Sequence, residues 1–142
     1  MPVTVKKVVL WRKEIENKPG VLAGVLEPLA GADLQVVMGY RYPGAENKAA
    51  IELYPIANKK NTAAAQSAGL EASSIPTLLV QGDNRPGLGY AIAKALRDGG
   101  INIGFLVGQV ILGKYSAVVG FDNDTDADRA IPLIKKAVSA RK

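Results

Sequence analysis

Cysteine and histidine are both missing from this chain of 142 residues. Their absence excludes disulfide bonds, thiolate nucleophiles, zinc sites built from Cys and His, and proton transfer by imidazole near neutral pH. No apolar run approaches the roughly 18 residues of a membrane-spanning helix. The opening "MPVTVKKVVLWRKE" has too short an apolar stretch for a signal peptide. We therefore expect a cytoplasmic protein with no membrane segment, no metal and no cofactor.

Acidic residues are fewer than basic ones, 13 against 18, which gives a formal net charge of +5. A basic chain raises the possibility of an anionic partner. The excess is scattered, however, in short groups such as "KK" at 6–7, "NKK" at 58–60 and "KK" at 135–136. Scattered lysines are typical of a solvated surface, so we do not expect a nucleic-acid partner.

One design occurs twice in the chain. The stretch "ENKPGVLAGVLEPLAGADLQVVM" at 16–38 aligns without a gap with "DNRPGLGYAIAKALRDGGINIGF" at 83–105. The repeat predicts two modules, over residues 1–70 and 71–142. A module of that size buries only about 60% of the surface that its unfolded chain exposes. We therefore expect the two halves to pack against each other or against another copy of the chain, most simply in a homodimer.

Each half has the pattern β-α-β-β-α. Strands are predicted over 6–14, 34–42, 48–54, 75–81, 101–109 and 115–121. Helices are predicted over 21–30, 61–68, 88–96 and 126–140. Pro28 should shorten or kink the first helix, and Asn61 or Thr62 should cap the second. The order predicts antiparallel sheets with both helices on one face, and the segment Leu70 to Gln81 is free to pair with either half.

Apolar positions also predict which side chains face the core. The first helix places Leu22, Val25, Leu26 and Leu29 on one face. The strand over 101–109 places Ile101, Ile103, Phe105 and Val107 on one side.

The repeated element "N-[KR]-P-G" lies between a strand and a helix. It forms a tight turn before a helix whose first backbone N–H groups have no internal partner, and these donors suit a carboxylate or phosphate. Gly20 and Gly87 let a ligand approach the main chain. Gln35 and Asn102 begin the next strand with an amide, which suits an ammonium and a carboxylate. Pro-Gly before a helix is also an ordinary turn, but its repetition at one spacing favours a binding site.

These residues resemble a tandem pair of ACT domains, a family of small-molecule-binding regulatory modules. "DNRPG" with "ALRDGGINI" carries the resemblance in the second half, and "ENKPGVL" with "PLAGADLQV" carries it in the first. The second copy matches better, because "GGINI" is close to the opening of the second strand that is usual in the family. The first copy has Asp33-Leu34-Gln35 there. Gly89 departs from the family, which has an apolar residue at that position.

The resemblance implies an α+β fold of two ferredoxin-like βαββαβ modules, paired side by side through their sheets. It implies a non-catalytic regulatory protein that binds an amino acid between modules and acts on a separate effector protein. Asp83 or Glu16 would receive the ammonium group. The ligand-binding residues implied in the second half are Asp83, Asn84, Arg85, Gly87, Leu88, Asn102 and Ile103. The counterparts in the first half are Asn17, Lys18, Gly20, Val21, Gln35 and Val36.

Two alternatives share this order of strands and helices. An RNA-recognition module would need aromatic side chains on the exposed face of its central strands, where the chain offers few candidates, such as Tyr115 and Phe121. A hydrolase of acylphosphatase type would use a loop arginine and a second-strand asparagine, which Arg85 and Asn102 resemble. "DNRPG" lacks the longer phosphate cradle of that family, and no pair of catalytic carboxylates is evident.

Overall fold

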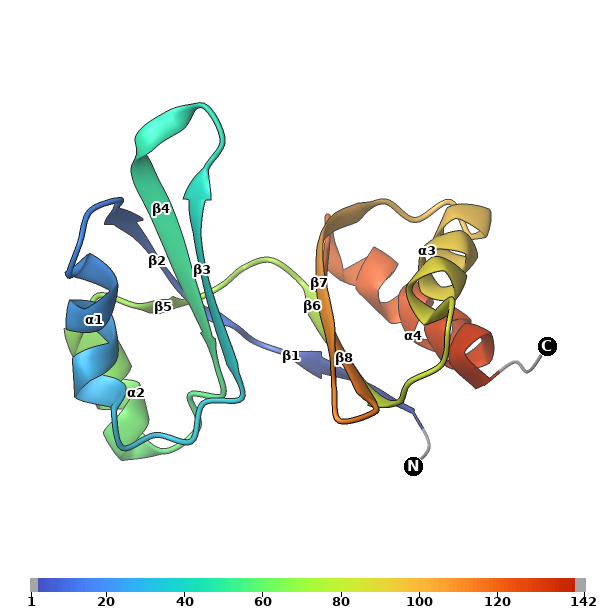
Figure 1. The fold of residues 1–142 in the computed structure, drawn as a ribbon, viewed down its shortest axis with the longest axis horizontal. Coiled ribbons are helices and arrows are strands. Elements are labelled where there is room, and N and C mark those ends of the chain that lie inside the picture. Colours follow the sequence, from blue (N-terminus) through green and yellow to red (C-terminus); the bar gives the residue numbers. More distant parts are fainter. Residues whose placement is uncertain (1–2, 140–142) are drawn as a thin grey trace. The chain divides into compact units, whose positions relative to one another are not determined.

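A computed structural model describes residues 3–139 and divides them into two compact units (Figure 1). The central unit contains residues 9–74 and holds the first copy of the repeat. The terminal unit joins the described residues before Val9 to those from Ile75 onward, and it holds the second copy. Both units have the predicted α+β architecture, with four strands and two helical segments around one core each.

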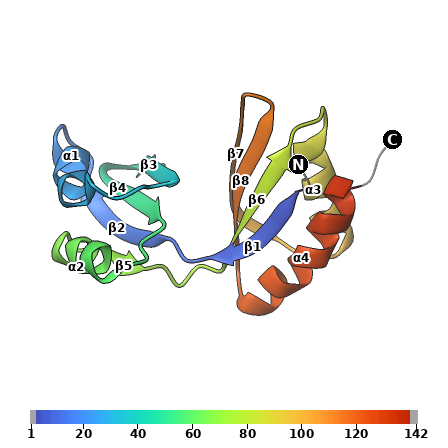
Figure 2. The same ribbon diagram turned by 90° about the horizontal axis from the view of Figure 1, so that it is seen from below.

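The central unit follows the predicted βαββαβ order. Its elements are β2 (Trp11–Glu16), α1 (Val21–Leu26), the 3₁₀ helix η1 (Glu27–Leu29), β3 (Val36–Tyr42), β4 (Ala45–Tyr54), α2 (Lys59–Ser67) and β5 (Glu71–Ala72). The strands form one antiparallel sheet in the order β3-β4-β2-β5. Figure 2 shows that α1 and α2 cover one face of this sheet.

The terminal unit repeats the same topology with strands taken from both ends of the sequence. Its elements are β1 (Thr4–Val8), β6 (Thr77–Asp83), α3 (Leu88–Asp98), β7 (Ile103–Ile111), β8 (Lys114–Phe121) and α4 (Asp124–Ser139). The sheet is antiparallel in the order β1-β6-β8-β7. Helices α3 and α4 pack beside each other on one face (Figure 1).

The predicted strand over 6–14 is divided between the two sheets. It is interrupted at Val9 and Leu10, so that β1 pairs with β6 in the terminal unit while β2 lies in the central unit. The compact units therefore differ from the contiguous division into 1–70 and 71–142. The physical reason is that the edge of β6 presents backbone N–H and C=O groups that need partners, and β1 supplies them. The segment Leu70 to Gln81 serves both sheets, because β5 pairs with β2 and β6 with β1 and β8.

Helix boundaries follow the local chemistry closely. The α-helical part of the first helix ends at Leu26, and Pro28 lies in η1, as expected from a residue that has no N–H to donate. Helix α2 begins two residues earlier than predicted. Its cap is Asn58, whose side-chain oxygen accepts from the backbone N of Asn61 at 2.7 Å. The prediction that Asn61 or Thr62 caps this helix is therefore wrong.

The two cores are built from the predicted faces, with one exception in each unit. On α3, Leu88, Ile92 and Leu96 are all buried. On the first helix, Val25 and Leu29 are buried but Leu22 is 40% exposed. The predicted apolar face of the strand over 101–109 also divides, because the register shifts between Ile103 and Phe105. Ile103 packs against the core opposite Phe121, whereas Phe105 pairs with Gly120 and so faces the other side.

Every helix within residues 3–139 is too short or too polar to cross a bilayer.

Candidate functional site

The repeated bend has the same backbone geometry in both units. Gly20 precedes α1 with φ 87°, and Gly87 precedes α3 with φ 82°, both in the left-handed region that favours glycine. A Cβ atom added to either glycine would have no neighbour within 4 Å in the part of the chain that the structure describes. The glycines are therefore required by the turn, and the space beside them is open.

Helix α3 presents unpaired donors at this bend. Within the described residues, the backbone N–H groups of Gly89 and Tyr90 donate to no protein acceptor, whereas that of Leu88 donates to Arg85 O at 3.3 Å. Among the same residues, no atom lies within 4 Å of the position that a Cβ on Gly89 would occupy. The start of α3 is thus an exposed set of N–H groups at the positive end of a helix.

The two residues before the second bend are already engaged with the β7–β8 turn. The ammonium of Lys114 hydrogen-bonds Asp83, and this contact lowers the pKa of the Asp83 carboxyl to about 2. The backbone N of Asn84 donates to Gly113 O at 2.9 Å. These contacts leave the Asp83 carboxylate ionised and hold the loop against the hairpin.

Arg85 and Leu88 have structural partners. Arg85 Nη2 donates to Ala137 O in α4 at 2.9 Å. Leu88 is 2% exposed and belongs to the core of the terminal unit. The Arg85 guanidinium therefore ties the loop to α4, and the Leu88 side chain is directed away from the loop surface.

The predicted residues on β7 and before it differ in exposure. Asn102 is exposed and its Nδ2 donates to Asp122 Oδ2 at 3.3 Å. Ile103 is half-buried and packs against the core. Of this pair, only the Asn102 side chain is exposed, and its amide is already hydrogen-bonded to Asp122.

In the central unit, Asn17 and Lys18 fix the first bend. Asn17 Nδ2 donates to Glu46 O at 3.0 Å, and its backbone N donates to Asn47 O at 3.0 Å. Lys18 Nζ lies 2.9 Å from Glu16 Oε2, and this hydrogen bond lowers the pKa of the Glu16 carboxyl. The first loop therefore carries an ammonium and a carboxylate side by side on the surface.

The remaining predicted residues of the first half are mainly structural. Val21 is half-buried, and its backbone N donates to Lys18 O at 3.4 Å. Gln35 is exposed and its backbone N donates to Tyr54 O at 2.8 Å. Val36 pairs with Tyr54 in the sheet. Of these three, only the Gln35 amide is presented to solvent.

A depression of about 270 Å³ lies beneath the first loop. Its walls come from the end of β2, the start of α1, and the facing parts of β3 and β4. The lining residues are Ile15, Glu16, Asn17, Lys18, Leu22, Gly39, Tyr40, Arg41, Ala49 and Ala50. A second, more polar depression adjoins it and is lined by Glu14, Ile15, Glu16, Asn17, Lys18, Asn47 and Lys48. The sequence predicted Asn17 and Lys18 here, but the residues from β3 and β4 gave no signal.

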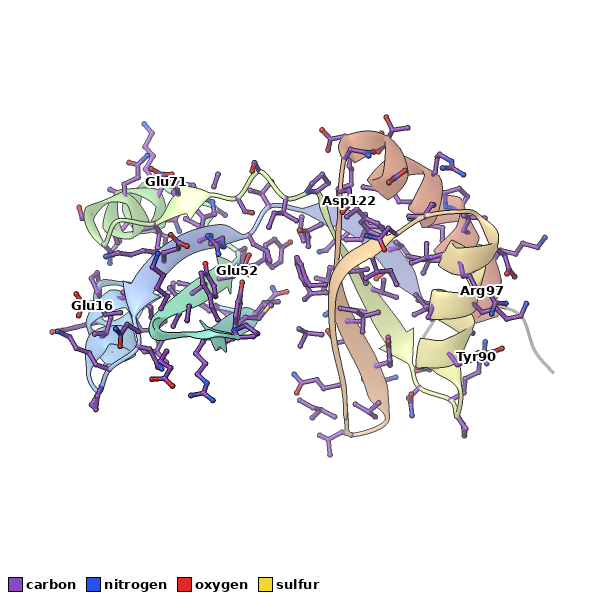
Figure 3. All side chains as sticks on the ribbon, turned by 90° about the horizontal axis from the view of Figure 1, so that it is seen from above. Glu16, Glu52, Glu71, Tyr90, Arg97 and Asp122 are labelled. Carbon is purple, nitrogen blue, oxygen red and sulfur yellow. The ribbon has the colours of Figure 1, made fainter. Side chains whose placement is uncertain are left out.

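A polar network, also unanticipated, lies on the face of the same sheet that α1 and α2 leave open, and Figure 3 labels one of its members, Glu52. Tyr40 Oη donates to Glu52 Oε2 at 2.8 Å, and Tyr42 Oη donates to Glu14 Oε1 at 2.9 Å. Arg12 donates to the Tyr42 hydroxyl and lies over its ring. Burial, with the Glu52 hydrogen bond, raises the pKa of the Tyr40 phenol. Glu52 is 1% exposed, and within residues 3–139 neither its Oε1 nor Arg12 Nε has a hydrogen-bond partner.

The two alternative functions find little support in this geometry. Tyr115 and Phe121, the aromatic candidates for stacking RNA bases, are 7% and 2% exposed and lie in the core of the terminal unit. Arg85 and Asn102, the candidates for an acylphosphatase-like site, are bound to α4 and to Asp122. Among residues 3–139, no group of three His, Cys, Asp or Glu side chains is arranged to hold a metal ion.

Solved structures show which fold this is. The chain matches protein BT0572 from Bacteroides thetaiotaomicron with a TM-score of 0.73, over 93% of this chain and 89% of that one. It matches the ligand-free regulatory subunit of aspartate kinase from Thermus thermophilus with a TM-score of 0.61, over 96% and 97% of the two chains. Both matches have 18% sequence identity. The chain has a tandem ACT fold.

The ACT fold extends to a third structure, a putative C-terminal regulatory domain of aspartate kinase from Porphyromonas gingivalis W83. That match has a TM-score of 0.58 and 11% identity and covers 97% and 96% of the chains. Neither a protein-family model nor a curated protein sequence matches the chain. At these identities the structures establish the ACT architecture, and the chain resembles regulatory subunits along nearly their whole length.

Proposed function

We propose that this tandem ACT protein is a non-catalytic regulator that binds a free amino acid at its Asn-Lys/Arg-Pro-Gly loops. The observation that carries the proposal is the repeated bend itself. Both copies place a glycine in the left-handed region immediately before a helix, with open space beside it. A turn that serves only to connect a strand with a helix does not require the same four-residue pattern twice.

Each loop offers the groups that a zwitterion needs. At the second loop, the N–H groups of Gly89 and Tyr90 suit a carboxylate, and the Asp83 carboxylate is ionised across the physiological range. At the first loop, Lys18 and Glu16 present one charge of each sign. An amino acid is the simplest ligand that carries both complementary charges on one carbon.

Regulation follows if the ligand favours one state of the protein over another. A ligand shifts such an equilibrium only by its difference in affinity for the two states. We propose that the states differ in the pairing of this chain with a second copy or with a separate effector protein, as the similarity to regulatory subunits suggests. In this scheme the chain carries the signal and another protein carries any chemistry.

A thermal-shift screen over the twenty common amino acids tests the proposal. A ligand at about one hundred times its Kd adds roughly 2.7 kcal/mol to the stability of the state that binds it. For a unit of this size, each kcal/mol raises Tm by about 4–8 °C. We expect at least one amino acid to raise Tm by about 10 °C or more at that saturation.

The same screen includes mononucleotides, a short RNA and an acyl phosphate. Stabilisation by RNA with no effect of any amino acid would replace the proposal by the RNA-binding alternative. Turnover of the acyl phosphate would replace it by the hydrolase alternative.

A further inference from the structure

We infer that the central unit alone carries the amino-acid pocket, and that this pocket takes an aliphatic side chain. The inference rests on the proposed function and adds which of the two loops binds and what it selects. It comes from comparing positions that are equivalent in the two sheets, where one unit has a small residue and the other a large one.

Sheet register identifies the equivalent positions. Ile15 and Gly82 each lie two residues before the loop asparagine, and they pair with Ala49 and Tyr115 respectively. Ala49 and Tyr115 therefore occupy the same place in the two ladders, although the ungapped repeat aligns Ala49 with Ser116.

A second pair of positions lies on the adjacent strand. Gly39 in β3 pairs with Ile51, and Gly108 in β7 pairs with Ala117. Ile51 and Ala117 in turn face Lys13 and Val80, which are equivalent in the repeat. Gly39 and Gly108 are thus equivalent as well.

In the terminal unit this space is filled. The Tyr115 side chain is 7% exposed, and its hydroxyl lies 3.2 Å from where a Cβ on Gly108 would stand. The phenol thus lies over Gly108, in the place where a ligand of the second loop would have to insert its side chain.

In the central unit this space is partly filled by Leu22, whose place in the repeat is taken by Gly89 in the terminal unit. Among the described residues, a Cβ added to Gly39 would be in ordinary van der Waals contact with the methyl groups of Leu22, the nearer at 3.8 Å, and with no other atom within 4 Å. Gly39, Leu22 and Ala49 all line the depression of about 270 Å³ beneath the first loop. Alanine in place of tyrosine therefore leaves a depression beside Leu22, whereas the Tyr115 phenol covers Gly108 in the terminal unit.

The lining selects the kind of ligand. Ile15, Leu22 and Ala49 form an apolar floor, and the cations Lys18 and Arg41 are also among the lining residues. A ligand that buries an aliphatic chain on this floor and directs its carboxylate to the cations satisfies both. A charged side chain on the floor would lose its hydration without a partner. The volume is below that of pockets for drug-sized ligands, which favours a molecule of about the size of leucine.

Isothermal titration of the full chain with L-leucine tests the inference. We expect one molecule bound per chain in the wild type, and no detectable binding to Ala49→Tyr, which places the ring of the terminal unit into the open pocket. Tyr115→Phe is the matched control because it keeps the ring, and its affinity should stay within about twofold. Circular dichroism establishes that Ala49→Tyr is folded.

Lys18→Ala tests the same site through an exposed side chain whose loss leaves the core intact. Removal of a charged partner of the carboxylate should weaken leucine binding about tenfold, whereas Lys60→Ala, an exposed lysine on α2, should not change it. Two leucines per chain, undiminished binding to both Ala49→Tyr and Lys18→Ala, or selection of aspartate or lysine over leucine would overturn the inference and leave the proposed function standing. If none of the twenty amino acids binds the wild type, both fall.

Discussion

Tyr115→Ala is the most informative test of how the terminal unit is packed. The Tyr115 ring is 7% exposed and covers Gly108. A buried aromatic side chain removes about 150–250 Å² from water, which at about 25 cal/mol per Å² corresponds to about 4–6 kcal/mol. Large-to-small substitutions of aromatic core residues cost about 3–5 kcal/mol. We therefore expect Tyr115→Ala to destabilise the terminal unit by about 3–5 kcal/mol, and Tm to fall by more than about 12 °C.

The assay has to observe the correct unit. The single tryptophan, Trp11, lies in the central unit, so its fluorescence does not report directly on the core around Tyr115. Hydrogen exchange measured on peptides from β6 and β8 does, because Tyr115 lies in β8 and pairs with Gly82 of β6. Tyr115→Phe is the control. It removes a hydroxyl that makes no hydrogen bond within the described residues and should cost less than about 1 kcal/mol.

A small effect of Tyr115→Ala would refute the packing argument. If the loss is below about 1.5 kcal/mol, the ring does not fill a closed space, and the proposed difference between the two loops loses its physical basis. If Tyr115→Phe costs as much as Tyr115→Ala, the hydroxyl and not the ring is the stabilising group.

Three further predictions concern local features of the terminal unit. Gly87→Ala should lower the free energy of unfolding by about 1–2 kcal/mol in urea denaturation, because φ 82° strains a residue with a Cβ. Gly89→Ala, in open space inside α3, should be neutral or stabilising by up to about 1 kcal/mol. Equal effects of the two substitutions would contradict the conclusion that the turn requires a glycine at position 87. The contact with Lys114 lowers the pKa of Asp83 to about 2. The stability that this contact contributes is therefore present above the ordinary carboxyl pKa and is lost as the pH falls from about 4 toward 2. Asp83→Asn should flatten the dependence of Tm on pH in that window, and an unchanged dependence would show that the contact is not formed in solution. Pro132→Ala in the interior of α4 should raise the free energy of unfolding by about 1–3 kcal/mol, because it restores one helical hydrogen bond. A lower Tm of this variant in thermal melting would show that the surrounding structure favours proline at this position.

The candidate site was predictable where it depends on local chemistry. The Pro-Gly bends at 19–20 and 86–87 indicated two strand-to-helix turns, and the structure gives both glycines a positive φ. The amides of Gln35 and Asn102 are exposed at the starts of the following strands. Individual side-chain roles were less predictable, because Arg85 bonds to Ala137, which is 52 residues away in sequence.

The pocket depends on register, which the repeat alone did not reveal. An alignment by residue offset places Ala49 opposite Ser116, whereas the ladders place it opposite Tyr115. The discrepancy of one residue changes which face of the sheet a side chain occupies. A comparison of the two loops from sequence therefore favoured the second copy, while the open depression described here lies at the first.

The sequence by itself determined two β-α-β-β-α patterns, because apolar periodicity, proline and glycine act on neighbouring residues and need no distant partner. Only the tertiary structure decided that β1 leaves its neighbour β2 to complete the sheet of the other unit. The pairing of one strand with another uses backbone N–H and C=O groups that are alike at every residue except proline. The side chains of Thr4–Val8 therefore do not indicate which strand this segment pairs with. The partner strand depends on which sheet edge lies within reach.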